Sequence, residues 1–310
     1  PEDLVIDIGS NDGTLLSGFA ANGTRTLGVD PAENLAELAK QSGVQTYTGY
    51  FGESTASDIL KQYGPASAVT ATNTFPHIQD LDDFMRGIDT ILKPDGALVL
   101  EFHYIMDILD QCAFDTIYHE HVSYWGLRPA SALFERHGFQ IVDVERLPIH
   151  HGQMRVFIQR EGQSVVSPSV GEQIKSEDSA GIPDFSTYVD LAAQAGRIKR
   201  DIADTLARLS NDGDTVVGYG APAKANTLIS YLELGPENVP YIVDRSPLKQ
   251  GRYTPGTHIP IVDPERLLAE QPAYVLLLAW NFRDEILAQQ DVYRKNGGKF
   301  IIPVPEVQII

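Results

Sequence analysis

The stretch Val5-Ile6-Asp7-Ile8-Gly9-Ser10-Asn11-Asp12-Gly13 predicts a short buried strand, a glycine loop and the start of a helix. Glycine lets the backbone approach a ligand closely and adopt angles that other residues resist. The helix that follows the loop offers unpaired backbone N–H groups at its first turn. A plain tight turn with a helix cap is the structural alternative. We interpret the stretch as a nucleotide-type strand–loop–helix unit.

A carboxylate ends the next predicted strand, in Leu27-Gly28-Val29-Asp30. At that position it can accept both ribose hydroxyls of a nucleoside, and the spacing suits NAD as well as S-adenosylmethionine. The loop departs from G-x-G-x-x-G, because Asn11 stands where a pyrophosphate needs close backbone approach. The departure favours S-adenosylmethionine. The residues predicted to bind it here are Asp7, Gly9, Asn11, Asp12, Gly13 and Asp30.

Strand and helix patterns alternate through the first half of the chain, which favours a parallel sheet covered on both faces. Two later strand patterns, at 140–146 and 154–159, are joined by a short polar link without a helix, which predicts an antiparallel pair. Lys93-Pro94-Asp95-Gly96 is typical of a turn. The predicted fold is therefore α/β, with a Rossmann-like methyltransferase sheet closed by an antiparallel strand pair. The earlier predicted strands are 4–8, 26–29, 46–47, 68–71 and 97–102.

The second half of the chain predicts a second α/β domain. Residues 163–184 are rich in Ser, Gly, Pro and charge and indicate an exposed connection, and 185–209 indicate one long helix. Strand and helix patterns then alternate from 215 to 302. The predicted organisation is an S-adenosylmethionine-binding methyltransferase domain at 1–162, a linker and long connecting helix at 163–212, and a C-terminal Rossmann-like domain at 213–310.

The net charge and the cysteine content of the chain limit the kinds of partner and of covalent cross-link that we expect. The 310 residues carry a formal net charge of −18, which disfavours binding to nucleic acid and to anionic membrane surfaces. Cys112 is the single cysteine and cannot form an internal disulfide. No apolar run is long enough to span a bilayer, and the first residues do not resemble a signal peptide. We expect a cytoplasmic protein, monomeric or homodimeric, that acts on a small molecule.

Two polar clusters follow predicted strands at the carboxyl edge of the first sheet, where open α/β sheets bind ligands. In 73–77, we predict that Asn73, Thr74, Phe75 and His77 line the cofactor. The second cluster, 114–121, supplies a possible general base, an orienting group and a hydrogen-bond donor. Its His-x-His can also chelate a metal, but no Cys or carboxylate cluster completes such a site, so we predict none. A structural capping role for these histidines is the other alternative.

Five separated motifs are spread in order over essentially the whole chain, at 118–121, 151–155, 218–224, 244–251 with 254–256, and 279–282. Together they resemble the sugar-nucleotide C-methyltransferase family. The resemblance implies S-adenosylmethionine-dependent methylation of a carbon next to a ketone, commonly C3 of a dTDP-4-keto-deoxysugar. It implies that His121 removes the α-proton and that Tyr118 and Glu120 are its catalytic neighbours.

The same resemblance implies that the C-terminal domain helps to hold the sugar nucleotide. Lys224 adds a cation beside a predicted helix N-terminus, which suits a diphosphate. An exposed helix lysine is the alternative for Lys224, and core packing is the alternative for Trp280. The residues predicted to bind substrate are His151, Arg155, Gly218, Tyr219, Gly220, Ala221, Lys224, Asn226, Asp244, Lys249, Tyr253, Trp280 and Asn281.

One departure from the family concerns its N-terminal zinc-binding domain, which usually carries four cysteines. No such segment precedes the first predicted strand, so we expect either a fragment or a shortened family member. Two rival functions stay open at this point. One is an NAD-dependent sugar-nucleotide oxidoreductase, and the other is a catalytically incomplete fragment that binds a sugar nucleotide.

Overall fold

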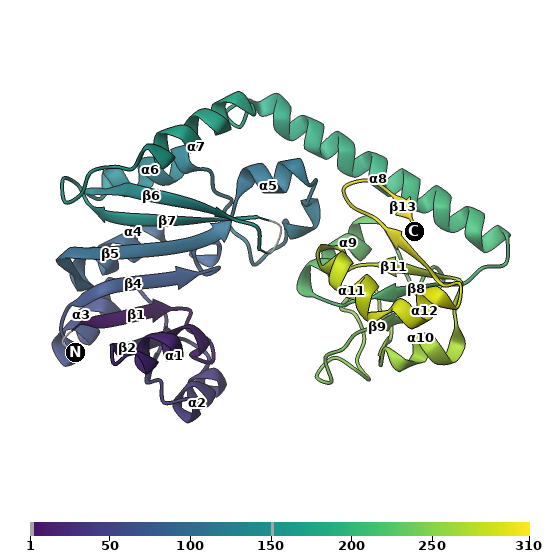
Figure 1. Cartoon of the computed structure of the whole chain (residues 1–310), viewed down its shortest axis with the longest axis horizontal. Coiled ribbons are helices and arrows are strands. Elements are labelled where there is room, and N and C mark those ends of the chain that lie inside the picture. Colours follow the sequence, from purple (N-terminus) through teal and green to yellow (C-terminus); the bar gives the residue numbers. More distant parts are fainter. Residues whose placement is uncertain (1–2, 150–151) are drawn as a thin grey trace. The chain divides into compact units, whose positions relative to one another are not determined.

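The computed structural model describes residues 3–149 and 152–310, which divide into two units (Figure 1). Unit 1 comprises Pro1–Asp107 and Glu120–Pro183, and unit 2 comprises Ile108–His119 and Asp184–Ile310. The chain therefore passes from one unit to the other three times. The short segment Ile108–His119 lies within the first predicted domain in sequence but folds with unit 2.

Unit 1 is built on a seven-stranded sheet in the order β3-β2-β1-β4-β5-β7-β6. The first five strands are parallel, and β7 lies antiparallel between β5 and β6. The strand order reverses beside β1, and loops at the carboxyl ends of neighbouring strands diverge at such a point. The predicted Rossmann-like sheet with its antiparallel closing pair is confirmed. Its strands are β1 (Leu4–Ile8), β2 (Arg25–Asp30), β3 (Thr46–Thr48), β4 (Ala66–Thr72), β5 (Leu92–His103), β6 (Phe139–Leu147) and β7 (Gln153–Arg160).

Helices cover this sheet and bury its apolar strands. Every residue of β1 is buried, which explains its near-continuous apolar sequence. Helix α4 (Leu81–Ile91) begins at Asp80, whose side chain accepts the Asp83 N–H, and buries Phe84, Met85 and Ile88. The other helices of the first 183 residues are α1 (Thr14–Ala21), α2 (Glu33–Gln41), α3 (Glu53–Tyr63), η1 (Phe75–His77), α5 (Ile105–Asp110), η2 (Phe114–Thr116), α6 (Leu127–Arg136) and α7 (Pro168–Ser179).

Two local predictions were wrong. The predicted turn at Lys93–Gly96 lies inside β5, whose pairing with β4 shifts register between Ala66 and Ala68. A strand irregularity of this kind tolerates a proline. The predicted linker contains α7, which begins after Ser167 with Pro168 in its first turn. The polar sequence of α7 suggests an exposed linker, but its Glu177 is buried. The Glu177 carboxylate accepts hydrogen bonds from Tyr104 Oη (2.8 Å) and Leu127 N (2.6 Å).

Unit 2 contains a six-stranded sheet in the order β10-β9-β8-β11-β12-β13. Five strands are parallel, and β13 adds an antiparallel edge that the sequence analysis missed. No helix among the described residues is both long and apolar enough to cross a membrane. The elements are α8 (Phe185–Asn211), β8 (Val216–Tyr219), α9 (Ala223–Tyr231), β9 (Ile242–Val243), β10 (Ile261–Val262), α10 (Glu265–Glu270), β11 (Tyr274–Leu277), η3 (Trp280–Phe282), α11 (Arg283–Gln289), α12 (Asp291–Lys295), β12 (Lys299–Ile302) and β13 (Gln308–Ile309).

Candidate active site

The glycine loop after β1 is held against the loop after β4. Gly9 has a φ of 73°, and its N–H donates to the Val29 carbonyl at 2.8 Å. A Cβ at Gly9 would lie 2.2 Å from Thr74 Oγ1. Gly13 also has a positive φ, 78°, and precedes the first turn of α1. Both glycines are therefore required by backbone conformation, and Gly9 also by lack of space.

Asp30 fixes the carboxyl end of β2. Its Oδ2 accepts the Asn11 N–H at 3.0 Å, and its Oδ1 accepts the Ala32 N–H at 2.9 Å. The residue is 7% exposed. Each carboxylate oxygen has further acceptor capacity after one such bond, so ribose hydroxyls can still be bound. Asp30 is thus positioned by the two loops that it joins.

Asp7, in contrast, is an internal residue of the sheet. It is 2% exposed, and its Oδ1 accepts the hydroxyl of Thr70 at 2.6 Å. Burial raises the pKa of the Asp7 carboxyl to about 6, with a further contribution from the charge of Asp30, against a lowering by the Thr70 hydrogen bond. Any effect of Asp7 on the site is therefore indirect, through its hydrogen bond with Thr70 and its electrostatic interaction with Asp30.

Replacement of Asp7 by asparagine is expected to stabilise the protein at neutral pH. Because the folded-state pKa lies above the unfolded value, the native state holds the proton more tightly, and stability falls as pH rises from about 4 to about 6. The variant lacks this cost, so its advantage in unfolding free energy should grow by roughly 2 kcal/mol between pH 4.5 and pH 8. Urea unfolding at both pH values measures it. Parallel stability curves for the two proteins would contradict the raised pKa, and Asp58→Asn on an exposed helix face is the control.

A cavity of about 500 Å³ opens beside this loop in unit 1. Of the predicted cofactor residues, Gly9, Thr74 and His77 line it. Tyr50 and Phe51, which follow β3 at the same sheet edge, supply an aromatic wall that was not predicted from the sequence. Aromatic residues between Gly49 and Gly52, directly after a strand, are the signal that could have identified them. The other lining residues are Ile8, Val29, Pro31, Gly49, Ile78, Gln79, Asp80, Asp83 and Phe84.

Several predicted cofactor residues are not among those that line this cavity. Asp12 accepts hydrogen bonds from the backbone and hydroxyl of Thr14 at the start of α1. Asn73 has a φ of 56°, and its Oδ1 accepts from Gln153 Nε2 at 2.6 Å. Phe75 is fully buried and packs in the core of unit 1. Its aromatic neighbours are Phe84, Phe102, Trp125 and Phe134.

Three histidines of unit 1 come together near the end of β5. The ring centroid of His121 lies 5.0 Å from that of His77 and 5.2 Å from that of His103. His77 Nδ1 lies 2.7 Å from the Glu120 carbonyl, and Val122 N donates to the Pro76 carbonyl. His103 was not predicted, although it ends a strand at the ligand-binding edge. Across 3–149 and 152–310, no group of three or more His, Cys, Asp or Glu is arranged to hold a metal ion.

The motif 118–121 spans the division of the chain. Tyr118 and His119 belong to unit 2, and Glu120 and His121 belong to unit 1. Within unit 2, Tyr118 N donates to the Thr116 carbonyl at 3.2 Å, and its ring meets His119 edge-on at 6.2 Å. Each half of the predicted catalytic motif is thus placed by a different unit.

Unit 2 repeats the carboxylate arrangement of unit 1. Asp244, 8% exposed at the end of β9, accepts Ala221 N at 2.7 Å and Ser246 N at 2.8 Å. Lys249 Nζ lies 3.4 Å from its Oδ2. Gly220 has a φ of 85°, and a Cβ there would lie 2.5 Å from that of Ala279. A cavity of about 260 Å³ adjoins them, lined by Tyr219, Gly220, Pro222, Asp244, Arg245, Lys249, Ala279, Phe282, Glu285, Ile286 and Gln289.

Lys224 is not an exposed helix lysine. Its side chain is 12% exposed, and Nζ lies 3.6 Å from Asp115 Oδ2 and 4.0 Å from the centroid of the Trp280 ring. Burial lowers the pKa of Lys224 to about 8, against the opposing effect of Asp115. Trp280 is 6% exposed and donates its indole N–H to Asp115 Oδ2 at 2.7 Å. Trp280 therefore combines core packing with a polar contact.

The remaining predicted substrate residues have varied surroundings. Arg155 lies on β7 and is ion-paired with Glu101 and Glu145. Gly218 lies inside β8 rather than after it, where a Cβ would crowd Ile242. The exposed fractions of Tyr219 and Tyr253 are 3% and 63%. The side-chain oxygens of Asn226 and Asn281 are buried without a hydrogen-bond partner among the described residues. His151 lies outside the residues that the structure describes.

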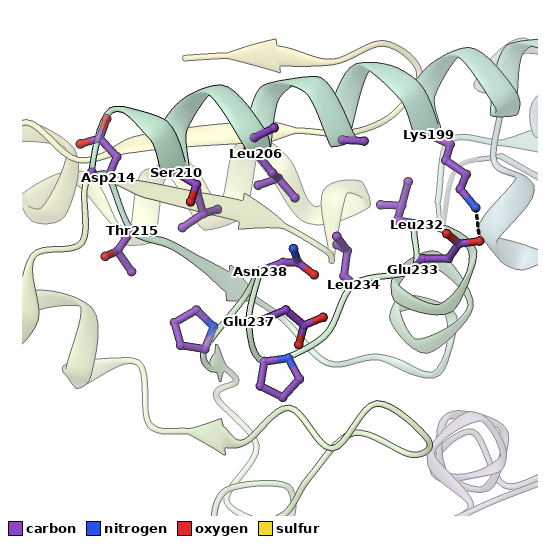
Figure 2. A pocket seen from close by; sticks show the side chains of 16 residues that line it. Lys199, Leu206, Ser210, Asp214, Thr215, Leu232, Glu233, Leu234, Glu237 and Asn238 are labelled. Carbon is purple, nitrogen blue, oxygen red and sulfur yellow. Dashed lines mark hydrogen bonds and ion pairs between the residues drawn. The ribbon is translucent and has the colours of Figure 1, made fainter.

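A further cavity of about 710 Å³ lies in unit 2 between α8 and the segment that follows α9 (Figure 2). Leu206 and Leu234 face it, and at one end Lys199 donates to Glu233 at 2.7 Å. None of the predicted site residues is among the described residues that line it. We therefore assign it no part in the site.

Two domain families match successive parts of the chain. Residues 2–144 match a methyltransferase domain family, and residues 148–305 match the C-methyltransferase C-terminal domain family. The C-methyltransferase NovU of Streptomyces niveus is 38% identical over 309 residues, which cover 99% of this chain and 74% of that protein. The ubiquinone biosynthesis O-methyltransferase of Xanthomonas axonopodis pv. citri is 31% identical over 100 residues, 31% of this chain and 41% of the relative.

Solved methyltransferase structures resemble about half of the chain. An S-adenosylmethionine-dependent methyltransferase from Anabaena variabilis has a TM-score of 0.41 at 16% identity, over 52% of this chain and 78% of that chain. Magnesium protoporphyrin IX methyltransferase from Synechocystis, with bound S-adenosylhomocysteine, has a TM-score of 0.39 at 16% identity, over 52% and 75%.

The cavity of unit 1 fits the cofactor that these families use. Its volume lies within the range of ligand pockets, and Phe51 and Phe84 supply apolar walls for an adenine ring. Gly9 lines the cavity beside Thr74, and the Asp30 carboxylate at the end of β2 keeps acceptor capacity for ribose hydroxyls. Two domain families match the chain, and one relative is similar over 99% of it. The chain therefore belongs to the family of S-adenosylmethionine-dependent C-methyltransferases.

Proposed function

We propose that the protein methylates a carbon next to the ketone of a nucleotide-linked keto-deoxysugar, with C3 of a dTDP-4-keto sugar as the expected position. One observation carries this proposal: a second nucleoside-type carboxylate, Asp244, in a unit separate from that of Asp30. One such site suffices for S-adenosylmethionine. The second supports a co-substrate that is itself a nucleotide.

Unit 1 binds and orients the methyl donor in this proposal. Asp30 accepts the ribose hydroxyls, Phe51 and Tyr50 enclose the base, and Gly9 admits the rest of the molecule next to the backbone. When bound, S-adenosylmethionine supplies an activated methyl group on a sulfonium. The residues of the chain then have to generate a carbon nucleophile.

His121 is the proposed base for that step. The ketone of the sugar acidifies the neighbouring C–H, and His121 takes the proton. The His121 ring lies about 5 Å from the rings of His77 and His103, at the end of the strand that leads to the ligand-binding edge. Tyr118 donates a hydrogen bond to the developing enolate oxygen, and Glu120 is the remaining catalytic neighbour. Holding both substrates in register contributes roughly 7–11 kcal/mol through proximity.

The nucleotide is assigned to unit 2. Asp244 accepts its ribose hydroxyls, and Lys249 and Arg245 face the same cavity and suit its diphosphate. The side-chain oxygens of Asn226 and Asn281, which are buried without a hydrogen-bond partner among the described residues, are acceptors for the remaining polar groups.

Labelled methyl transfer tests the reaction, and two matched variants test the site. With deuteromethyl S-adenosylmethionine and a dTDP-4-keto-deoxysugar, the product should carry the label on carbon. Asp30→Ala should weaken S-adenosylmethionine binding about 10- to 100-fold and leave dTDP affinity unchanged, because a hydrogen bond to a charged group contributes about 1.5–3 kcal/mol. Asp244→Ala should do the reverse. Calorimetry measures both affinities.

Two outcomes would overturn these assignments. Label recovered on oxygen would refute carbon methylation. Equal loss of both affinities in either variant would show that Asp30 and Asp244 do not serve separate ligands.

A further inference from the structure

The segment Ile108–His119 folds with unit 2 although it is flanked on both sides by chain that belongs to unit 1. Short-range bonds shape it: Ala113 N donates to the Ile108 carbonyl at 2.8 Å, and Thr116 Oγ1 donates to the Ala113 carbonyl at 2.7 Å. Its Phe114 ring lies 5.0 Å from that of Tyr231 in α9. Tyr118 is the next-to-last residue of the segment, so the conformation of the segment sets where that phenol lies.

Asp115 is the charged residue that this segment buries. It is fully buried, and desolvation raises the pKa of its carboxyl. Its Oδ2 receives the Trp280 indole N–H at 2.7 Å and lies 3.6 Å from Lys224 Nζ. Its Oδ1 is buried with no hydrogen-bond partner among the described residues. A buried carboxylate costs free energy unless it is paired, so Asp115 depends on these two contacts.

Lys224 and Trp280 come from distant parts of the chain. Lys224 lies in the first turn of α9, and Trp280 begins η3, which follows β11. The Lys224 ammonium lies over the face of the Trp280 ring at 4.0 Å from its centroid, a cation–π contact. Asp115, Lys224 and Trp280 thus contact one another pairwise, and we call them the buried anchor.

We propose that the buried anchor holds the segment Ile108–His119 in the conformation that presents Tyr118, and that Lys224 is a positioning residue rather than a ligand of the sugar nucleotide. Its charge is directed at Asp115 and is largely withdrawn from solvent. A free diphosphate ligand needs an accessible ammonium, which the exposed Lys249 of the same unit supplies. The buried Lys224 instead positions the segment by its contacts within the buried anchor.

A double-mutant cycle in the full-length chain tests this role. Lys224→Met and Asp115→Asn each leave one partner of a buried pair uncompensated, whereas the double variant removes both charges. Amide hydrogen exchange of residues 114–119 reports the order of the segment. We expect exchange to be faster by about 10²-fold or more in each single variant and to return most of the way in the double variant. Lys295→Met, which removes an exposed ion pair with Asp291 in the same unit, should leave this exchange unchanged.

Turnover and dTDP affinity complete the test, and the turnover measurement rests on the proposed function. The single variants should lower kcat by about 10²-fold through misplacement of Tyr118, with dTDP affinity unchanged, and the double variant should recover most of kcat. Loss of dTDP affinity in Lys224→Met but not in Asp115→Asn would overturn the proposal and make Lys224 a ligand. A double variant no better than the worse single variant would also overturn it. If the wild-type chain binds no dTDP, the proposed substrate class fails, and hydrogen exchange still decides the anchor.

Discussion

His121→Ala is expected to lower kcat for methyl transfer by about 10²- to 10⁴-fold, the contribution of a positioned general base. The His121 ring lies among His77 and His103, and alanine leaves no group at its position to accept the α-proton. S-adenosylmethionine affinity should be unchanged, since His121 does not line the cofactor cavity. Exchange of the substrate α-proton with deuterated solvent, followed by NMR without the methyl donor, should be lost together with turnover.

A histidine elsewhere in unit 1 provides the control for this variant. His137 pairs with Asp82 at 2.8 Å beside the C-terminus of α6, and His137→Ala should leave turnover and exchange unchanged. Undiminished α-proton exchange in His121→Ala would remove His121 as the base. Lost methyl transfer with retained exchange would instead assign it a role after proton removal.

Gly9→Ala is expected to disrupt both the fold of unit 1 and its cofactor site. Alanine at a φ of 73° is strained, and its Cβ would lie 2.2 Å from Thr74 Oγ1 and 2.9 Å from Thr74 Cγ2. Strain and overpacking together should lower the unfolding free energy by roughly 2–4 kcal/mol. The loops after β1 and β4 must separate to admit the methyl group, so S-adenosylmethionine affinity should fall about 10- to 100-fold. Urea unfolding and calorimetry measure the two effects.

Gly23→Ala separates the backbone strain from the clash. Gly23 has a φ of 79°, and a Cβ there would meet nothing within 4 Å. It should cost roughly 1 kcal/mol of stability without changing cofactor affinity. Thr74→Ala added to Gly9→Ala removes the two closest atoms and should restore part of the stability. Equal effects of Gly9→Ala and Gly23→Ala would show that contact with Thr74 is unimportant.

Local signals were sufficient for the fold of unit 1 and for part of the lining of its cavity. The buried β1, Gly9, Gly13 and Asp30 all lie within 30 residues of sequence, where spacing and residue type are directly informative. The antiparallel pair β6–β7 was predictable because two strand patterns follow each other without room for a crossover helix. The helix α7 was not, because its buried Glu177 carries the polarity of a linker residue.

Long-range proximity explains what was missed at the site. His103 ends β5 and has no motif of its own, and it becomes a candidate only because its ring lies near that of His121. Tyr50 and Phe51 likewise matter because β3 ends at the same sheet edge as β1. Such neighbours arise from strand order, which a single sequence does not specify residue by residue.

Gly9 and Lys224 show the difference between a residue whose role follows from local sequence and a residue whose role depends on contacts with distant segments. Gly9 was identified from its place between a buried strand and a helix, because a backbone requirement is encoded in the residue type itself. Lys224 had an equally clear local signal, because it lies two positions after Pro222 at the start of a helix. Its charge nevertheless faces the carboxylate of Asp115, 109 positions earlier in the chain. Conformational preferences act over a few residues and can be inferred from sequence. The partner of a buried charge is set by which distant segments pack together, and only the folded chain determines it.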